Sequence, residues 1–143
     1  MSVEMSGIVA LAFQLDKADA ALAATDAALA PVQGAGSVTV LHAIQDGYIR
    51  GIDCELEAAQ SDEDDVIFSV YIGGARDDDS EVTLAGAGTS EGASYGIARF
   101  DRPGIPVSEG DSILVKAKST DATNCKPGGL VAVVYLQLGE SGI

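Results

Sequence analysis

The sequence predicts an all-β protein, an eight-stranded antiparallel jelly-roll β-sandwich preceded by an N-terminal arm or a short Ala-rich helix. Residues 48–59 alternate between apolar and polar side chains, which is typical of a strand with one buried face and one wet face. Residues 66–72 and 130–138 are apolar on both faces, which favours central strands. No second long helical pattern follows residue 36, so a parallel sheet built from strand–helix–strand units is not expected.

The N-terminal 36 residues are expected to form an arm or helix outside the sandwich, and residues 37–143 to form the sandwich domain. Residues 7–15 have the composition of a strand. Residues 16–30 are rich in Ala and Leu, with Asp16 as a candidate N-cap, and predict a short helix. An extended arm is the alternative for this segment, because alanine offers little side-chain area to bury.

The predicted sandwich begins with a strand at residues 37–43. Asp46 and Gly47 follow it and predict a two-residue hairpin turn into residues 48–59. In that second strand the alternation points Ile52, Cys54 and Leu56 inward and the intervening carboxylates outward. The remaining predicted strands span residues 66–72, 81–84, 95–100, 105–119 and 130–138.

The charge balance excludes two classes of partner. The chain has 143 residues, 8 Lys and Arg against 22 Asp and Glu, and a formal net charge of -14. Unaided binding to nucleic acid or to an anionic membrane needs clustered cations, so neither is expected. A halophilic source is one interpretation of the acidity, and an ordinary acidic surface is the other. No stretch is apolar enough to span a bilayer, and the apolar N-terminal run lacks the positive residues of a signal peptide, which predicts synthesis in a cytoplasm.

Catalytic chemistry has little support in the sequence, and no enzyme activity or cofactor is expected. His42 is the single imidazole, and no nucleophile-elbow sequence accompanies it. Gly86, Gly88 and Gly92 have the wrong spacing for a dinucleotide loop, and no helix follows them. A surface loop is the expected structure of that segment.

Acidic clusters offer a weak metal hypothesis. Asp77, Asp79 and Glu81 are spaced at alternate positions, and their carboxylate oxygens could hold a hard cation such as Ca²⁺. Solvated loop charge is the simpler interpretation. Cys54 and Cys125 lack the close spacing of a zinc site, and two free thiols are expected, with a disulfide as the alternative.

Carbohydrate or receptor binding is a second functional hypothesis, because jelly rolls commonly serve as sugar-binding modules. Such modules stack sugars on exposed aromatic rings. The chain has no Trp, so Tyr48, Tyr71 and Tyr95 are the candidate platforms.

The two predicted strands that are apolar on both faces, residues 66–72 and 130–138, suggest a further role, because one sandwich core needs only one face of each strand. The second face could pack under the N-terminal segment or against another subunit.

Three runs resemble the small jelly-roll decoration, or cement, proteins of tailed-virus capsids, from bacteriophages or archaeal viruses. They read VTVLHAIQDGYIRGIDCELEAA, IPVSEGDSILVKA and GGLVAVVYLQL, and the resemblance covers about residues 37–138. It implies a structural virion protein that binds the major capsid protein on the outside of an icosahedral shell. It further implies a homotrimer that stabilises the junctions between capsomers, with residues 1–36 anchoring it to the shell or to a neighbouring subunit.

Overall fold

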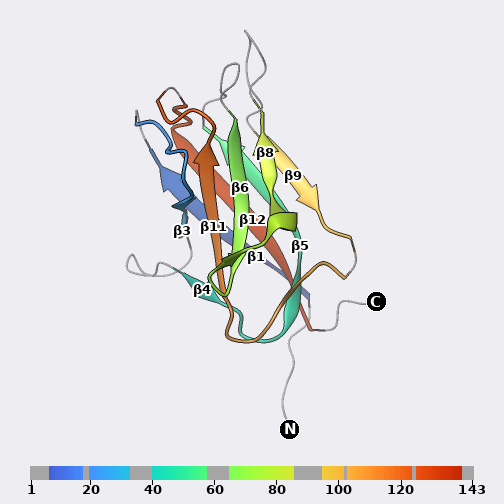
Figure 1. The fold of residues 1–143 in the computed structure, drawn as a ribbon. Helices are drawn as coiled ribbons and strands as arrows, with labels where there is room; N and C mark the ends of the chain where they lie inside the picture. Colours follow the sequence, from blue (N-terminus) through green and yellow to red (C-terminus); the bar gives the residue numbers. More distant parts are fainter. Residues whose placement is uncertain are drawn as a thin grey trace.

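The computed structural model describes residues 7–17, 20–32, 40–57, 65–85, 95–101, 103–123 and 125–139. In this part of the chain two antiparallel β-sheets pack face to face, and the helical content is a single short 3₁₀ turn at Asp78–Ser80. Figure 1 shows the two layers, with β11 and β6 in front of β12, β1 and β5. The predicted all-β class and the β-sandwich architecture are therefore confirmed.

The first sheet, called sheet A here, contains six strands. Five follow one another in the order β10 (Ile105–Val107), β5 (Gly47–Leu56), β12 (Gly129–Leu138), β1 (Gly7–Asp16) and β3 (Ala30–Pro31). The sixth, β9 (Tyr95–Arg99), pairs with β5 beside β10, so two short strands share one edge of β5.

The second sheet, called sheet B, also contains six strands. Its order is β2 (Ala27–Ala28), β11 (Ser112–Ser119), β6 (Val66–Ile72) and β7 (Ala75–Arg76), while β4 (Leu41–His42) pairs with β11 and β8 (Val82–Leu84) with β6. The long strands of both sheets coincide with the predicted segments. Shorter strands complete the edges. The sequence predicted β8, β9 and β10 among them, whereas the two-residue strands β2, β3 and β7 were not predicted.

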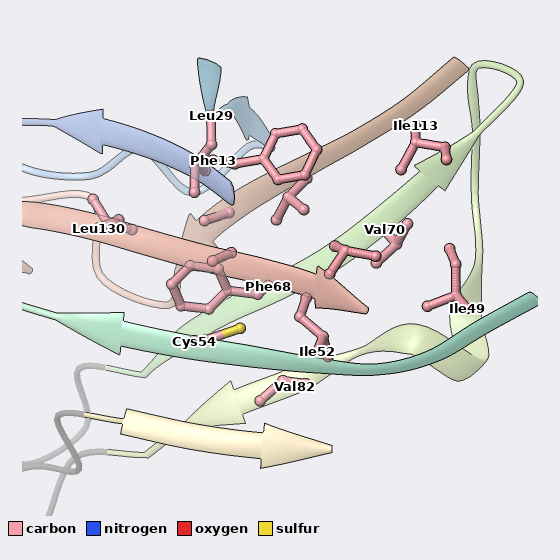
Figure 2. Close-up of a cluster of buried hydrophobic side chains, with 14 of the residues drawn as sticks. Phe13, Leu29, Ile49, Ile52, Cys54, Phe68, Val70, Val82, Ile113 and Leu130 are labelled. Atoms are coloured by element: carbon pink, nitrogen blue, oxygen red, sulfur yellow. The ribbon is translucent and has the colours of Figure 1, made fainter. Parts of the chain in front are cut away.

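The core lies between the two sheets and is built from alternate residues of each long strand. Phe13 from sheet A and Phe68 from sheet B are both fully buried, and the aliphatic side chains of neighbouring strands surround them (Figure 2). The predicted polarity of residues 48–59 is confirmed as far as Glu57. Ile52, Cys54 and Leu56 are buried, whereas Glu55 is exposed on the opposite face.

A β-bulge interrupts the pairing of β5 with β12. Tyr135 pairs with Gly51 and Leu136 pairs with Ile49, so Arg50 is the extra residue. Strict alternation cannot bury both Ile49 and Ile52, which are three positions apart, yet both are fully buried. The bulge resolves this conflict because it turns Arg50 and Gly51 together toward the outer face of sheet A.

The helix predicted for residues 16–30 is wrong, because the described part of this segment is extended and includes β2. Its backbone instead joins the sandwich: Leu22 N–H donates to the Cys125 carbonyl at 2.8 Å, and Ser119 N–H donates to the Ala23 carbonyl at 2.9 Å. Leu22 and Leu29 are fully buried in the core. An Ala-rich helix has too little apolar area to compete with these contacts.

The boundary expected at residue 36 does not separate the N-terminal segment from the sandwich. β1 pairs with β12 at ten successive positions, from Gly7 opposite Leu138 to Asp16 opposite Gly129. The following segment passes from sheet B to sheet A, because β2 pairs with β11 and β3 pairs with β1. The described part of residues 7–32 therefore belongs to both sheets of the sandwich and supplies a strand at one edge of each, β3 in sheet A and β2 in sheet B.

The Asp46-Gly47 hairpin is also wrong. The strands on either side of this turn belong to different sheets, because β4 pairs with β11 and β5 pairs with β12. Gly47 is required by close packing, since a Cβ there would lie 2.4 Å from the Gln137 carbonyl oxygen. The tight hairpin lies at Gly73 and Gly74, whose φ angles of 61° and 86° suit a type I′ turn between β6 and β7.

The two cysteines are free and buried, as expected from the sequence. Burial raises the pKa of the Cys54 thiol, and the neighbouring charge of Asp53 raises it further. Cys54 is therefore a neutral side chain that packs in the core.

Candidate functional site

The most unusual surface is the outer face of β1 and β12, the two central strands of sheet A. The register brings their outward side chains together in one block, here called the β1–β12 face. It consists of Ile8, Ala10, Ala12, Gln14, Val131, Val133, Tyr135 and Gln137. None of these eight residues is charged, in a chain whose formal net charge is -14, and the block ends at the exposed Asp16, the next outward residue of β1.

Much of the β1–β12 face is open to solvent. Ile8 is 61% exposed, Val131 42% and Tyr135 36%. Val32 is 49% exposed and continues the apolar surface beyond β1, because its N–H donates to the Ala12 carbonyl at 2.9 Å. A water-facing side of an antiparallel sheet is normally polar, so this composition needs another explanation.

The sequence of β12 is apolar on both faces and left open whether the second face packs under the N-terminal segment. Among the described residues it does not. Leu130, Ala132 and Val134 are fully buried in the core, which uses one side of the strand. The segment of residues 20–32 lies at the edge of the sandwich and leaves Val131 and Tyr135 exposed. No described residue buries this second side of β12 at Val131 or Tyr135.

The outer face of sheet B differs, because its polar groups bind one another. Tyr71 donates a hydrogen bond to Asp26, and the Lys116 ammonium lies 4.3 Å from the centroid of the Tyr71 ring. Arg76 pairs with Glu81 and donates to Ser69 Oγ at 3.2 Å. Polar side chains on this face therefore contact one another, in contrast to the β1–β12 face.

Beside the β1–β12 face, the bulge of β5 forms a cleft of about 360 Å³. Its floor is Gly51, which pairs with Tyr135 of β12 on one side and with Arg99 of β9 on the other. Because Gly51 has no side chain, the space between Tyr135 and Arg99 stays open. A Cβ at this position would lie 2.8 Å from the Ala98 carbonyl oxygen, so the close approach of β9 also requires glycine.

The lining of the cleft combines charged and apolar side chains. Arg50, Asp53 and Arg99 line it together with Ile97 and Tyr135. The Nε atom of Arg50 is buried and has no hydrogen-bond partner in the structure. Gly104 leaves room for this side chain, since a Cβ there would lie 3.2 Å from Arg50 Cδ. We call this site the bulge cleft.

The acidic residues proposed for a cation do not converge. Asp77 Oδ1 accepts the Asp79 N–H at 3.0 Å, which caps the 3₁₀ turn, and Glu81 is paired with Arg76. Among the described residues no group of three or more His, Cys, Asp or Glu could hold a metal ion. Asp62 and Asp64, which form a second acidic cluster with Asp65 in the sequence, lie outside the described residues, as does the glycine-rich loop at residues 86–92.

The aromatic candidates separate into different environments. Tyr71 is engaged with Asp26, and Tyr48 is half-buried, whereas Tyr95 is 67% exposed on the outer face of sheet A. Sequence reasoning missed Tyr135, the residue that borders both the β1–β12 face and the bulge cleft. The alternation of Val131, Val133 and Tyr135 was the signal that could have identified it.

His42 lies exposed on the two-residue strand β4, opposite Ser112. It is separate from the bulge cleft, whose lining contains no imidazole or cysteine. Across the described residues, no helix is long and apolar enough to cross a membrane. Comparison with known proteins finds no family model and no curated protein that matches the chain.

Proposed function

We propose that the protein is a structural virion component, a decoration or cement protein that binds the major capsid protein on the exterior of an icosahedral shell. In this proposal the chain acts as a homotrimer and stabilises capsomer junctions without catalysis. The β1–β12 face is the contact between subunits. The observation that carries the proposal is that eight outward residues in register on this face carry no charge, as far as Asp16 at the end of β1.

The energetics favour burial of this face. Apolar area removed from water contributes roughly 25 cal/mol per Å², so exposed Ile8, Val131 and Tyr135 favour association. The rest of the chain supplies the charge that keeps assembled particles apart, since 22 acidic residues outweigh 8 basic ones. A protein with one apolar face and an acidic remainder suits a subunit that associates with its own copies through that face and stays dispersed otherwise.

We further infer that the sandwich is an eight-stranded jelly roll with short additional edge strands. The strand order supports this inference, because β1, β12, β5 and β9 are neighbours in sheet A, and β2, β11, β6 and β8 are neighbours in sheet B. Taken in chain order, these eight strands lie in sheets A, B, A, B, B, A, B and A, which is the succession expected of two interlocked Greek keys. This topology places the first and last strands side by side, which creates the β1–β12 face.

Absolute mass in solution tests the proposed assembly. Light scattering after size exclusion is expected to give three times the 14.5 kDa of one chain. Val131→Asp places a charge in the β1–β12 face and is expected to give monomers that remain folded. Thr83→Asp, at an exposed position of β8 in sheet B, is the matched control and is expected to leave the mass unchanged. A monomeric wild type, or a Val131→Asp trimer, would contradict the use of this face.

Attachment to a shell is a separate measurement. The full chain is expected to co-sediment with icosahedral shells assembled from a major capsid protein encoded in the same genome. Val131→Asp is expected to lose most of this binding. A trimer attaches to the shell through three weak sites at once, whereas the monomeric variant has one. Wild-type trimers that stay in the supernatant would reject the capsid role while leaving the trimer intact.

A further inference from the structure

We propose that the bulge cleft binds a carboxylate carried on a six-membered sugar ring, a hexuronate unit of an acidic glycan. This inference goes beyond the proposed structural role and concerns a site on the neighbouring strands β5 and β9 and on Tyr135, which borders the β1–β12 face, so it requires a subunit contact that leaves the cleft side of the Tyr135 ring open. It rests on three properties of the cleft: an open floor at Gly51, two arginines in its lining, and the aromatic residue Tyr135 in the same lining.

The dimensions come from the strand register. Tyr135 and Arg99 stand on the strands that flank β5, so their backbones are two strand spacings apart, about 9–10 Å. Gly51 leaves the space between them empty. A single pyranose ring fits this width with its apolar face against the Tyr135 ring, which is how aromatic side chains bind sugars.

The charges select an acidic ligand. The chain has only 8 basic residues, yet Arg50 and Arg99 line the same cleft of about 360 Å³. Arg50 Nε is buried without a hydrogen-bond partner among the described residues, so one donor of this cleft-lining arginine is unsatisfied. Guanidinium groups bind carboxylates through paired, charge-assisted hydrogen bonds, which makes a carboxylate the acceptor that fits.

Asp53 distinguishes a sugar from other carboxylates. It is the next outward residue after Gly51 along β5, and it lines the cleft opposite Ile97. A carboxylate on the wall repels a second negative charge but accepts hydrogen bonds from hydroxyl groups. A ring that carries one carboxylate and several hydroxyls satisfies both arginines and Asp53, whereas benzoate satisfies the arginines alone.

The bulge explains the position of this site on sheet A. Arg50 reaches the outer face because it is the extra residue of the bulge, and its carbonyl accepts the Phe100 N–H at 3.0 Å as β9 ends. Here the partner of β5 changes from β9 to β10. Bulges of this kind redirect side chains next to functional sites.

The test uses the full chain and sodium D-galacturonate or D-glucuronate as probes. Amide chemical shifts in ¹⁵N-labelled protein are expected to move at Gly51, Ile97 and Tyr135 with millimolar affinity. The neutral sugars D-galactose and D-glucose are expected to cause no shifts. Benzoate is expected to bind at least threefold more weakly than the uronates, because it offers no hydroxyl to Asp53.

Variants then assign the effect to the cleft. Arg99 is exposed on an edge strand, so Arg99→Gln is expected to fold normally and to weaken uronate binding about tenfold, the loss expected for a charge-assisted hydrogen bond. The uronate affinity of Arg99→Lys is expected to lie between that of wild type and that of Arg99→Gln. Lys118→Gln makes the same charge change on the outer face of sheet B and is expected to bind like wild type.

Several outcomes would overturn the proposal: no shifts with either uronate, equal binding of the neutral sugars, tighter binding of benzoate, or unchanged affinity in Arg99→Gln. The subunit contact is measured separately through Val131→Asp, which lies outside the cleft lining. Uronate binding by a monomeric Val131→Asp protein would support the cleft independently of the trimer. Failure of the trimer proposal would therefore leave the proposed uronate site of the bulge cleft unaffected.

Discussion

The hydroxyl of Tyr71 on β6 donates a hydrogen bond to the carboxylate of Asp26, which immediately precedes β2. The two residues are 45 positions apart, so this contact fastens the N-terminal segment to the centre of sheet B. The second carboxylate oxygen, Asp26 Oδ1, is buried without a hydrogen-bond partner in the structure. The phenol is therefore the principal partner of a carboxylate that has lost part of its hydration.

Removing this hydroxyl should destabilise the fold. Tyr71→Phe leaves the Asp26 carboxylate without its donor, and we expect the free energy of unfolding to fall by about 1–3 kcal/mol. Urea denaturation at pH 7 measures the change. Tyr48→Phe is the matched control, because no hydrogen bond of the Tyr48 hydroxyl is seen among the described residues, and it should cost less than 0.5 kcal/mol. Equal effects of the two substitutions would contradict a structural role for the contact.

The same contact should make stability depend on alkaline pH. The hydrogen bond to Asp26 is the main reason that the pKa of Tyr71 is raised, with desolvation and the Asp26 charge adding to it. A raised pKa in the folded state means that the contact contributes fully below about pH 10, the ordinary tyrosine value, and is lost as pH rises through the folded pKa. Urea midpoints between pH 8 and pH 11 should fall more steeply for wild type than for Tyr71→Phe. Parallel curves would argue against this assignment.

β1 should behave as a core strand rather than as a detachable arm. Phe13 is fully buried, and its outward neighbour Gln14 is exposed on the same strand. We expect Phe13→Ala to lower the free energy of unfolding by about 3–5 kcal/mol, and Gln14→Ala to change it by less than 0.5 kcal/mol. Deletion of residues 1–36 should prevent folding, because it removes a strand paired at ten positions. A stable deletion variant would show that the sandwich closes without β1.

Sequence patterns predicted the long strands because burial on one or both faces imposes a direct signal. Cys54 and Leu56 show this, since both alternate with carboxylates and both are buried. The patterns failed where tertiary contacts decide the backbone. Leu22 and Leu29 have helical spacing, yet each enters the core from an extended chain whose hydrogen bonds go to other segments. Such long-range pairings leave no local signature.

The candidate sites also depend on long-range pairing that local sequence patterns do not show. The outward alternation of Val131 and Tyr135 is visible in the sequence, but their alignment with Ile8 depends on pairing between the two ends of the chain. The bulge cleft was not predictable, because Arg50 and Arg99 meet across a register that only the fold sets. Gly51 alone carried a hint, since glycine inside a strand often marks a bulge or a close approach.

The thiols should be unreactive in the folded protein. Cys54 and Cys125 are both fully buried, and burial raises the pKa of the Cys54 thiol, so the thiolate is scarce at pH 8. We expect Ellman's reagent to detect no rapidly reacting thiol in native protein and both thiols in guanidinium chloride. Native reactivity within minutes would mean that the core around Cys54 opens readily. Absence of free thiols after denaturation under non-reducing conditions would instead indicate a disulfide.

Salt should stabilise the protein strongly at neutral pH. The formal net charge is -14, and the ion pairs seen among the described residues both involve Arg76. Repulsion between carboxylates therefore outweighs attraction, and raising NaCl from 10 mM to 1 M shortens the screening length from about 30 Å to about 3 Å. We expect the melting temperature to rise with NaCl at pH 7.5. At pH 4.5, close to the isoelectric point of about 4.1, the rise should be much smaller, because most of the repulsion has been titrated away. Light scattering at each condition separates this effect from a change in assembly, and an equal rise at both pH values would show that salt acts through apolar burial instead of charge.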